Sequence, residues 1–255
     1  MKYLPLLLVM LLAGCGGQNV KTGSGSDPQY SELQALLLSG HEQLSKRNSK
    51  KAIADFDKAI ELCEALYPSD GKIVYASRGT TETLYYMLLA SADSEGAFTV
   101  DTTCSEALYL RGYSALDLGD LNLAEEYVKR AIDMAPVNSV YLSELGHIYQ
   151  TKKEWESALD LFSQAEVSAT SFSPDELKSH ELARAKRGVG FALVELGRLD
   201  DAEEKFKECL EIDADDKGAK HELQYIEQLR QKASQERSGS DSEADEWLQP
   251  GVQGA

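Results

Sequence analysis

The chain has 255 residues and a formal net charge of −17, from 43 acidic and 26 basic side chains. Such an excess of acid repels phosphate, so it argues against nucleic acid and anionic lipid as partners. None of the four histidines lies in a His-Glu-x-x-His arrangement and no two of the four cysteines form a Cys-x-x-Cys pair. No metal site and no cofactor are therefore predicted.

The first 14 residues have the features of a secretory signal peptide. A single lysine, Lys2, precedes an apolar stretch at residues 4–13 that is too short to span a bilayer. The run Leu12-Ala13-Gly14-Cys15 resembles a bacterial lipobox. This resemblance implies a lipoprotein of the cell envelope with palmitate or a similar acyl chain on Cys15, on the periplasmic face of the outer membrane if the source is Gram-negative. A plain secretory signal in which Cys15 has no role is the alternative.

Two polar segments flank the central part of the chain. Residues 15–30 begin with Cys15 and are rich in Gly, Ser and other polar residues, which predicts a flexible tether. Residues 231–255 carry an excess of acid and little apolar content, which predicts a disordered acidic tail. The pair Trp247-Leu248 within that tail is either a short docking motif or without function.

Four sets of residues recur between the two flanks at one fixed spacing. In each set, a glycine is followed by an alanine at +12, a bulky residue at +16 and a small residue at +19. A glycine lets a second helix approach closely, and this spacing is expected to place the alanine opposite it. Each unit is therefore predicted to be two antiparallel helices, which stack because one unit cannot bury its apolar face alone. The sets are Gly40, Ala52, Phe56 and Ala59; Gly112, Ala124, Val128 and Ala131; Gly146, Ala158, Phe162 and Ala165; and Gly190, Ala202, Phe206 and Cys209.

These spacings resemble the tetratricopeptide repeat (TPR), a 34-residue helix–turn–helix unit. Gly119-Asp-Leu121 and Gly197-Arg-Leu199 match the turn of that family, Lys153-Glu-Trp155 is a variant, and Pro136 falls where its second helix ends. The resemblance implies an all-α, right-handed superhelix over residues 31–230. Ordinary helical hairpins that do not stack are the alternative. The units are expected at residues 33–66, 105–138, 139–172 and 183–216.

The segment at residues 67–104 is long enough for one more unit. A helix is expected at about residues 72–92, whereas Gly96 to Thr103 is rich in β-branched residues and lacks a helical period. The segment is therefore either a degenerate unit or a long connection. Cys63 and Cys104 flank it, and export would permit a disulfide that the sequence leaves open.

The remaining motifs do not indicate catalysis. Gly188-Val-Gly190 superficially resembles a dinucleotide loop, but it lies inside a predicted helix. No Gly-x-Ser-x-Gly elbow is present, so the chain is not predicted to be an enzyme and no small-molecule substrate is indicated. Cys209 is expected to be a buried packing residue. Ser173 is expected to cap a helix that begins at Pro174.

The family resemblance also implies a binding surface, because the first helices of the units line an inner groove. Aromatic and arginine side chains are frequent interface anchors, and arginine can bind a carboxylate through two hydrogen bonds. We therefore expect an extended partner segment with an apolar anchor and a carboxylate. Tyr113 and Phe191 could instead pack against neighbouring helices. The residues at the inner positions are Tyr109, Tyr113, Ser143, His147, Gln150, Arg184, Arg187 and Phe191.

Two functions are compatible with these features. The first is a lipid-anchored adaptor or scaffold that holds a protein partner of the envelope in its inner groove, such as a secretin, pilus, outer-membrane-protein or peptidoglycan-enzyme complex. The second is a structural periplasmic lipoprotein that self-associates and has no dedicated peptide ligand. A heterologous partner recovered from solubilised membranes would favour the first function.

Overall fold

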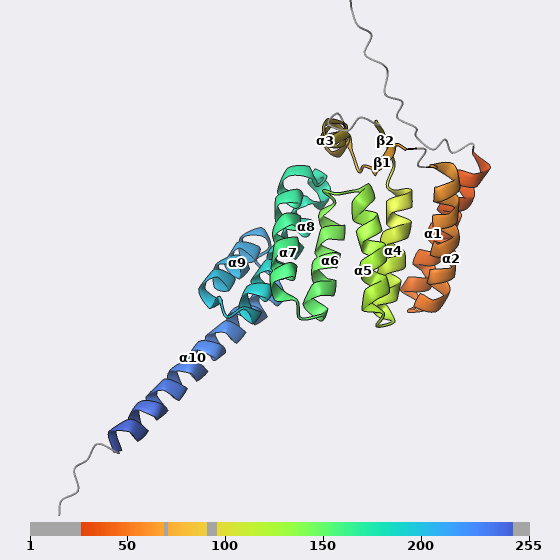
Figure 1. Cartoon of the computed structure of the whole chain (residues 1–255). Helices are drawn as coiled ribbons and strands as arrows, with labels where there is room; N and C mark the ends of the chain where they lie inside the picture. The colour runs from red at the N-terminus through yellow and green to blue at the C-terminus, as the bar shows by residue number, and fades with distance from the viewer. Residues whose placement is uncertain (1–26, 69–70, 91–95, 247–255) are drawn as a thin grey trace, which may run out of the picture.

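The computed structural model describes residues 27–68, 71–90 and 96–246, with side chains up to residue 235. The predicted signal peptide, Cys15, most of the predicted tether and Trp247-Leu248 lie outside these residues. The described part of the chain contains ten helices and two strands (Figure 1). Their order is α1 (Pro28–Ser45), α2 (Ser49–Leu66), β1 (Ile73–Ala76), α3 (Thr80–Ala90), β2 (Ala97–Val100), α4 (Thr103–Asp117), α5 (Leu121–Met134), α6 (Ser139–Thr151), α7 (Trp155–Phe172), α8 (Asp175–Glu195), α9 (Leu199–Ile212) and α10 (Lys217–Glu246).

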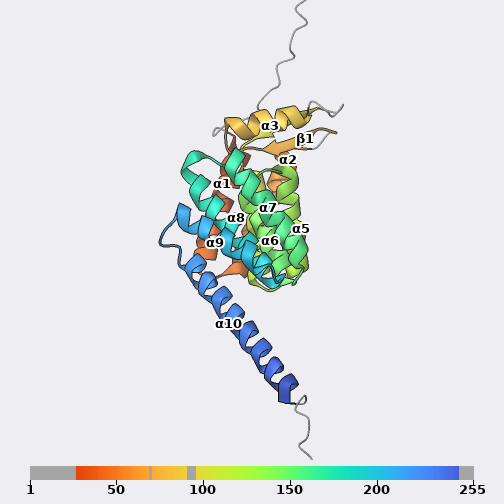
Figure 2. The ribbon, with the colours of Figure 1, turned by 90° about the vertical axis from the view of Figure 1, so that its left-hand side faces the viewer.

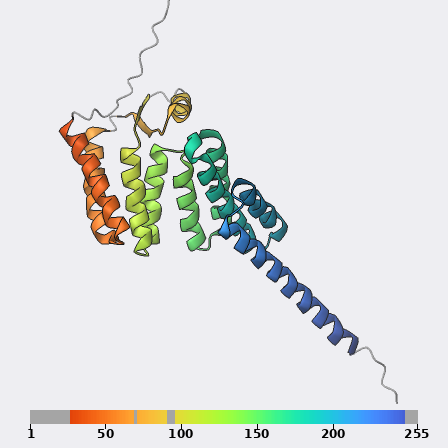
Figure 3. The same ribbon diagram turned by 180° about the vertical axis from the view of Figure 1, so that it is seen from behind.

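Four helical hairpins stack side by side in chain order, which confirms the predicted all-α superhelix. They are α1–α2, α4–α5, α6–α7 and α8–α9, and the row is seen from both sides in Figure 1 and Figure 3. The two helices of each hairpin pack extensively on each other, α7 also packs extensively on α8 of the next hairpin, and first helices such as α6 and α8 contact each other. No helix in the described ranges is long and apolar enough to cross a membrane.

The four hairpins share one turn geometry. In each turn, one residue has a positive φ, between 57° and 82°. Its amide bonds a carbonyl three residues back, and the next amide bonds one five residues back. This arrangement satisfies carbonyl groups at the end of the first helix. The turn residues are Arg47, Gly119, Lys153 and Gly197, so the two turns that lack the family's glycine still adopt its conformation.

The glycines of the repeat permit close helix packing, but their contact partner differs from the predicted one. A Cβ added at Gly190 would lie 2.8 Å from the ring of Phe206, and one at Gly40 would lie 2.3 Å from the ring of Phe56. The alanines at +12 are fully buried, yet the side chain over the glycine is the bulky residue at +16. A large ring needs a neighbour without a side chain, and this steric demand explains the spacing better than a glycine–alanine contact does.

Residues 67–102, here called the insertion, form a small β–α–β unit. The expected helix at residues 72–92 is wrong at its start, because Ile73–Ala76 is a strand and the helix is Thr80–Ala90. The two strands pair in parallel, with Ile73 opposite Ala97. A parallel pair needs a crossover, which α3 supplies. The β-branched and aromatic residues of β1 favour a strand, and the pairing with β2 outweighs the apparent helical pattern.

The insertion packs across one end of the solenoid (Figure 2). Ala76 and Val100 join the core of the first two hairpins. Tyr75 stacks on Tyr86 of α3 with ring centroids 4.9 Å apart, and both belong to a cluster with Val137 at the α5–α6 connection. The sheet is therefore buried between the repeats and α3.

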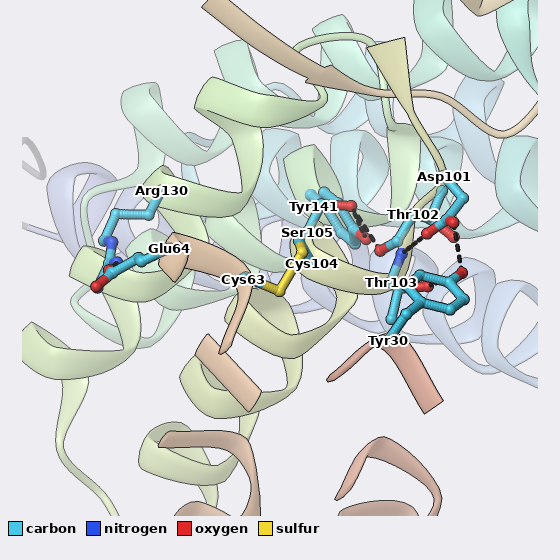
Figure 4. The surroundings of a disulfide bond; sticks show 10 residues. All are labelled: Tyr30, Cys63, Glu64, Asp101, Thr102, Thr103, Cys104, Ser105, Arg130 and Tyr141. Carbon is cyan, nitrogen blue, oxygen red and sulfur yellow. Dashed lines mark hydrogen bonds and ion pairs between the residues drawn. A yellow bond between two sulfur atoms is a disulfide. The ribbon is translucent and has the colours of Figure 1, made fainter. Parts of the chain in front are cut away.

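A disulfide joins Cys63 at the end of α2 to Cys104 at the start of α4, which answers the question the sequence left open (Figure 4). The two Cα atoms are 5.7 Å apart. Beside this bond, the Tyr30 hydroxyl of α1 donates to Asp101 Oδ2 at 2.5 Å. The disulfide therefore joins the two ends of the insertion, and the hydrogen bond from Tyr30 attaches the same region to α1.

A buried ionic network ties the insertion to α8. Arg78 contacts Glu82 Oε1 at 2.7 Å and Glu181 Oε1 of α8 at 2.8 Å. The Ser139 and Ser173 hydroxyls also donate to Glu181. Burial raises the pKa of Glu181, but these hydrogen bonds and the charge of Arg78 outweigh it and lower the pKa. Ser173 therefore does not cap a helix as predicted: α8 begins at Asp175, and the hydroxyl is used by Glu181.

The final helix, α10, extends beyond the last hairpin and away from it (Figure 1). Ala219 and Ile226 pack into the core of α8 and α9. The helix continues through the first part of the predicted acidic tail as far as Glu246. Glu, Gln, Lys, Arg and Ala dominate residues 217–235, and these residues favour a helix even where little apolar surface is buried.

Candidate functional site: a pocket between α6 and α8

Six of the eight predicted groove residues surround one pocket of about 230 Å³, here called the α6–α8 pocket. The two first helices that form it lie side by side in the stack. Residues spaced by one or two helical turns lie on the same face of a helix, so the predicted positions of each helix reach the same pocket. The six residues are Ser143, His147 and Gln150 from α6 and Arg184, Arg187 and Phe191 from α8.

Phe162 of α7 and Gly188 of α8 also line the α6–α8 pocket. A Cβ added at Gly188 would lie 2.2 Å from the Phe162 ring, so only glycine fits there. The same ring lies 3.1 Å from a Cβ built on Gly146. Phe162 is thus enclosed between glycines of two successive first helices. Gly188-Val-Gly190 lies inside α8, and its two glycines contact the Phe162 and Phe206 rings. The segment is therefore not a nucleotide-binding loop, which agrees with the prediction from the sequence.

Arg184 is held by a carboxylate within the protein. Its Nη2 lies 2.5 Å from Glu144 Oε2, and the Glu144 side chain is only 4% exposed. His147 Nδ1 lies 4.0 Å from the other carboxylate oxygen. Burial raises the pKa of Glu144, but interactions with His147 and Arg184 outweigh it and lower the pKa. Arg184 therefore neutralises a buried charge, and an incoming carboxylate would have to compete with Glu144.

Arg187 is similarly occupied. Its Nη1 lies 2.5 Å from Asp216 Oδ2, and Asp216 Oδ1 accepts a hydrogen bond of 3.0 Å from the Ala219 amide in the first turn of α10. Burial raises the pKa of Asp216, whereas the Ala219 amide and Arg187 lower it by a larger amount. Arg187 thus links the pocket to the start of α10, and the expected free arginine pair for a carboxylate is absent.

The two predicted tyrosines lie outside the α6–α8 pocket. Tyr109 of α4 stacks on Tyr141 of α6 with ring centroids 4.9 Å apart, and burial followed by the charge of Glu144 raises its pKa to about 12. Tyr113 is 41% exposed, so it is not the packing residue it could have been. Phe191 is partly exposed and lies beside Trp155, with centroids 6.4 Å apart.

Three polar side chains of the pocket are not held by the arginine ion pairs: Ser143, His147 and Gln150. Ser143 is 1% exposed, and its hydroxyl has no hydrogen-bond partner among the described residues. His147 is exposed and Gln150 is partly exposed. A buried hydroxyl without a partner is costly, so a ligand that bonds Ser143 would gain affinity.

A larger pocket of about 350 Å³ is lined by the two cysteines of the disulfide and by residues of α2, α4, α5 and β1. Its apolar lining includes Ile60, Leu108 and Met134, and the β1 residue Val74 lies at its edge. The repeat spacing did not predict this pocket, because a third of its lining residues come from the insertion. In the ranges that the structure describes, no group of three or more metal-binding side chains is found.

A family model of the tetratricopeptide repeat matches residues 33–66, 105–138 and 189–216. These three segments therefore match the tetratricopeptide repeat, and the α6–α7 hairpin between the second and third segments has the same turn. Repeats of this kind present extended surfaces for binding other proteins, so the chain has the architecture of an adaptor or scaffold. No curated protein sequence matches the chain significantly.

Solved structures show the same fold. PilF from Pseudomonas aeruginosa has a TM-score of 0.56 and 16% sequence identity, over 84% of this chain and 76% of that one. MamA, from residue 41 to its end, from Desulfovibrio magneticus RS-1 has a TM-score of 0.52 and 13% identity, over 86% of this chain and 98% of that one. At these identities, the likeness concerns the arrangement of helices.

Proposed function

We propose that this protein is a lipid-anchored adaptor of the bacterial cell envelope that holds a segment of a partner protein against α6 and α8. The observation that carries the proposal is the convergence of six inner-groove residues on one pocket. The pocket is smaller than the roughly 300–1,000 Å³ of small-molecule sites. It therefore suits one anchoring side chain of a longer segment, with the adjacent first helices holding the rest.

The contacts in the pocket indicate the chemistry of the anchoring side chain. Glu144 and Asp216 already pair with the two arginines, so a carboxylate is disfavoured. Phe162 and Phe191 offer aromatic surface, and Ser143 offers a buried hydroxyl that needs a partner. A neutral anchor with an apolar body and one polar group matches these features.

The envelope location is supported by two independent features. The lipobox-like run that ends at Cys15 would attach the chain to a membrane. The Cys63–Cys104 disulfide fits the same location, because such bonds persist in oxidising compartments and are rare in the cytosol. The Cys15→Ser variant should be released from membranes or fail to mature. A processed Cys15→Ser chain that still sediments with membranes would refute the anchor.

The adaptor function can be tested by photo-crosslinking in cells with a photoreactive amino acid at position 147. His147 is exposed at the pocket. Glu126 is exposed on α5, the second helix of its hairpin, and provides the control position. We expect adducts with a heterologous protein at position 147 and none at position 126. Adducts only with a second copy of this chain would support the self-associating alternative instead.

Once the crosslinked protein is identified, its affinity for variants of this chain shows which pocket residues contribute to binding. Phe191→Ala should weaken binding by about 1–2 kcal/mol or more if the ring is an anchor, and Glu126→Ala should leave it unchanged. Phe191 is partly exposed, so the variant should stay folded. If Phe191→Ala and a Gln150→Ala variant both bind as the wild type does, the α6–α8 pocket is not the site.

A further inference from the structure

Helix α3 presents an apolar, uncharged face to the surroundings. Leu84 and Leu88 lie one turn apart and are 67% and 68% exposed, and Thr80 and Thr81 on the same face are exposed too. Glu82 is the only charged residue of α3, and it is buried against Arg78 on the opposite face. An exposed apolar face on a chain with a net charge of −17 indicates an interaction site.

Helix α3 lies at the same end of the solenoid as the start of the described chain. The helix is the outermost layer at one end of the solenoid (Figure 2). The described chain starts at that end, because Tyr30 in the first turn of α1 bonds to Asp101 directly after β2. α10 projects away from the end that carries α3 (Figure 1).

The length of chain before α1 limits how far this end can lie from a membrane-attached Cys15. Eleven residues separate Cys15 from Asp27, the N-cap of α1. A fully extended chain covers about 3.5 Å per residue, so α1 would start within about 40 Å of the lipid anchor. The α3 face is thus kept near the bilayer, and a tethered contact needs far less intrinsic affinity than a free one.

We propose that α3 rests on the bilayer surface through Leu84 and Leu88 and so fixes the orientation of the anchored solenoid. This inference rests on the proposed lipid anchor. Apolar side chains of an interfacial helix enter the boundary between headgroups and acyl chains. The absence of charge on this face matters, because the acidic remainder of the surface is repelled by anionic lipid. The α6–α8 pocket and α10 are then held in a defined direction relative to the membrane.

The experiment uses the full lipidated protein in phosphatidylcholine vesicles that contain a quencher in the acyl region. A fluorescent label at Thr81→Cys reports on the α3 face, and a label at Leu118→Cys reports on the α4–α5 turn at the other end of the repeats. Cys209 is buried, and burial raises the pKa of its thiol to about 11, so it does not compete for the reagent. We expect quenching at position 81 to exceed that at position 118 by about twofold or more.

A second variant tests the leucines themselves. Adding Leu84→Glu and Leu88→Glu to the labelled Thr81→Cys chain should abolish the excess quenching and leave the melting temperature unchanged, because both leucines are exposed. Equal quenching at positions 81 and 118 in protein that floats with the vesicles overturns the inference while leaving the anchor intact. Protein that does not float overturns the anchor and this orientation together. If the label at position 81 is shielded from solvent in the absence of vesicles, the α3 face binds a second copy of this chain, and the bilayer contact is overturned.

Discussion

The repeats and the insertion are stabilised in different ways. The hairpins are held by contacts between a glycine and the bulky residue 16 positions later, which is a phenylalanine in three of the four, and by turns that recur in the same form four times. The insertion is held by polar contacts between residues far apart in sequence, such as Arg78 with Glu181 and Tyr30 with Asp101. Contacts of the first kind leave a period in the sequence, and contacts of the second kind leave none.

The largest effect is expected from removal of the Arg78 guanidinium, which pairs with Glu82 and with Glu181 of α8. Arg78→Ala would leave Glu82 and Glu181 buried without their positive partner, which costs about 3–5 kcal/mol. Hydrogen exchange should show that loss in β1, α3 and β2 and much less in α4 to α9. Arg198→Ala removes an exposed pair with Asp201 and should change stability by less than about 0.5 kcal/mol. A uniform loss over all helices after Arg78→Ala would show that the two regions unfold together.

Removal of the disulfide should have the next largest effect. Cys63 and Cys104 are 41 residues apart, and a cross-link that closes such a loop stabilises by about 2–4 kcal/mol. The Cys63→Ser and Cys104→Ser double variant should lose this amount in urea unfolding. Reductant should destabilise the wild type to the same level and have no effect on the variant. Equal stability of oxidised and reduced wild type would contradict the prediction.

Within the repeats, a methyl group added to a glycine should cost more stability the closer it lies to the ring. Gly190→Ala places a Cβ 2.8 Å from Phe206 and should cost about 1–3 kcal/mol. Gly146→Ala places it 3.1 Å from Phe162, and the gain in helix propensity of about 1 kcal/mol can offset that smaller clash. Thermal melts of the two variants should therefore rank Gly190→Ala as the less stable. The reverse order would refute ring proximity as the reason for the repeat's glycine.

The buried carboxylate beside the α6–α8 pocket gives the repeats a dependence on pH. Because the folded protein lowers the pKa of Glu144, it binds the proton less readily than the unfolded chain does. The stabilisation is complete above the ordinary glutamate pKa of about 4.3 and is lost as the pH falls toward the lowered value. The stability difference between wild type and Glu144→Gln in urea should therefore shrink below about pH 4.3. A difference that stays constant down to pH 3 would count against the lowered pKa.

The smallest effect concerns the two hairpin turns without glycine. Lys153 has a φ of 61°, a conformation that costs a residue with a side chain about 1–2 kcal/mol. Lys153→Gly should raise the stability by up to about 1 kcal/mol, since glycine also loses more freedom on folding. Gly119→Ala, at a φ of 82°, should change it in the opposite direction. Melting temperatures that move together in the two variants would exclude the turn conformation as the cause.

The spacing of small and bulky residues was enough to predict the hairpins, and six of the residues assigned to the groove line one pocket between α6 and α8. It missed the strand at Ile73, because the pairing with Ala97 depends on a partner 24 residues away. The pairing of Arg184 with Glu144 was also missed, because a glutamate within a helix looks the same in the sequence whether it is buried or exposed. The disulfide depends on a distance that only the folded insertion defines.

The position of the disulfide determines how the protein responds to mechanical force. A pull on the N-terminus peels away α1 and α2 as far as Cys63, and from there the tension passes through the sulfur atoms directly to Cys104 and α4. The residues between the two cysteines carry no tension. At about 3.5 Å per residue, the sequence separation of 41 would withhold about 140 Å of extension until the disulfide is reduced. A membrane-tethered chain would thus stay short under load in an oxidising compartment and lengthen abruptly in a reducing one.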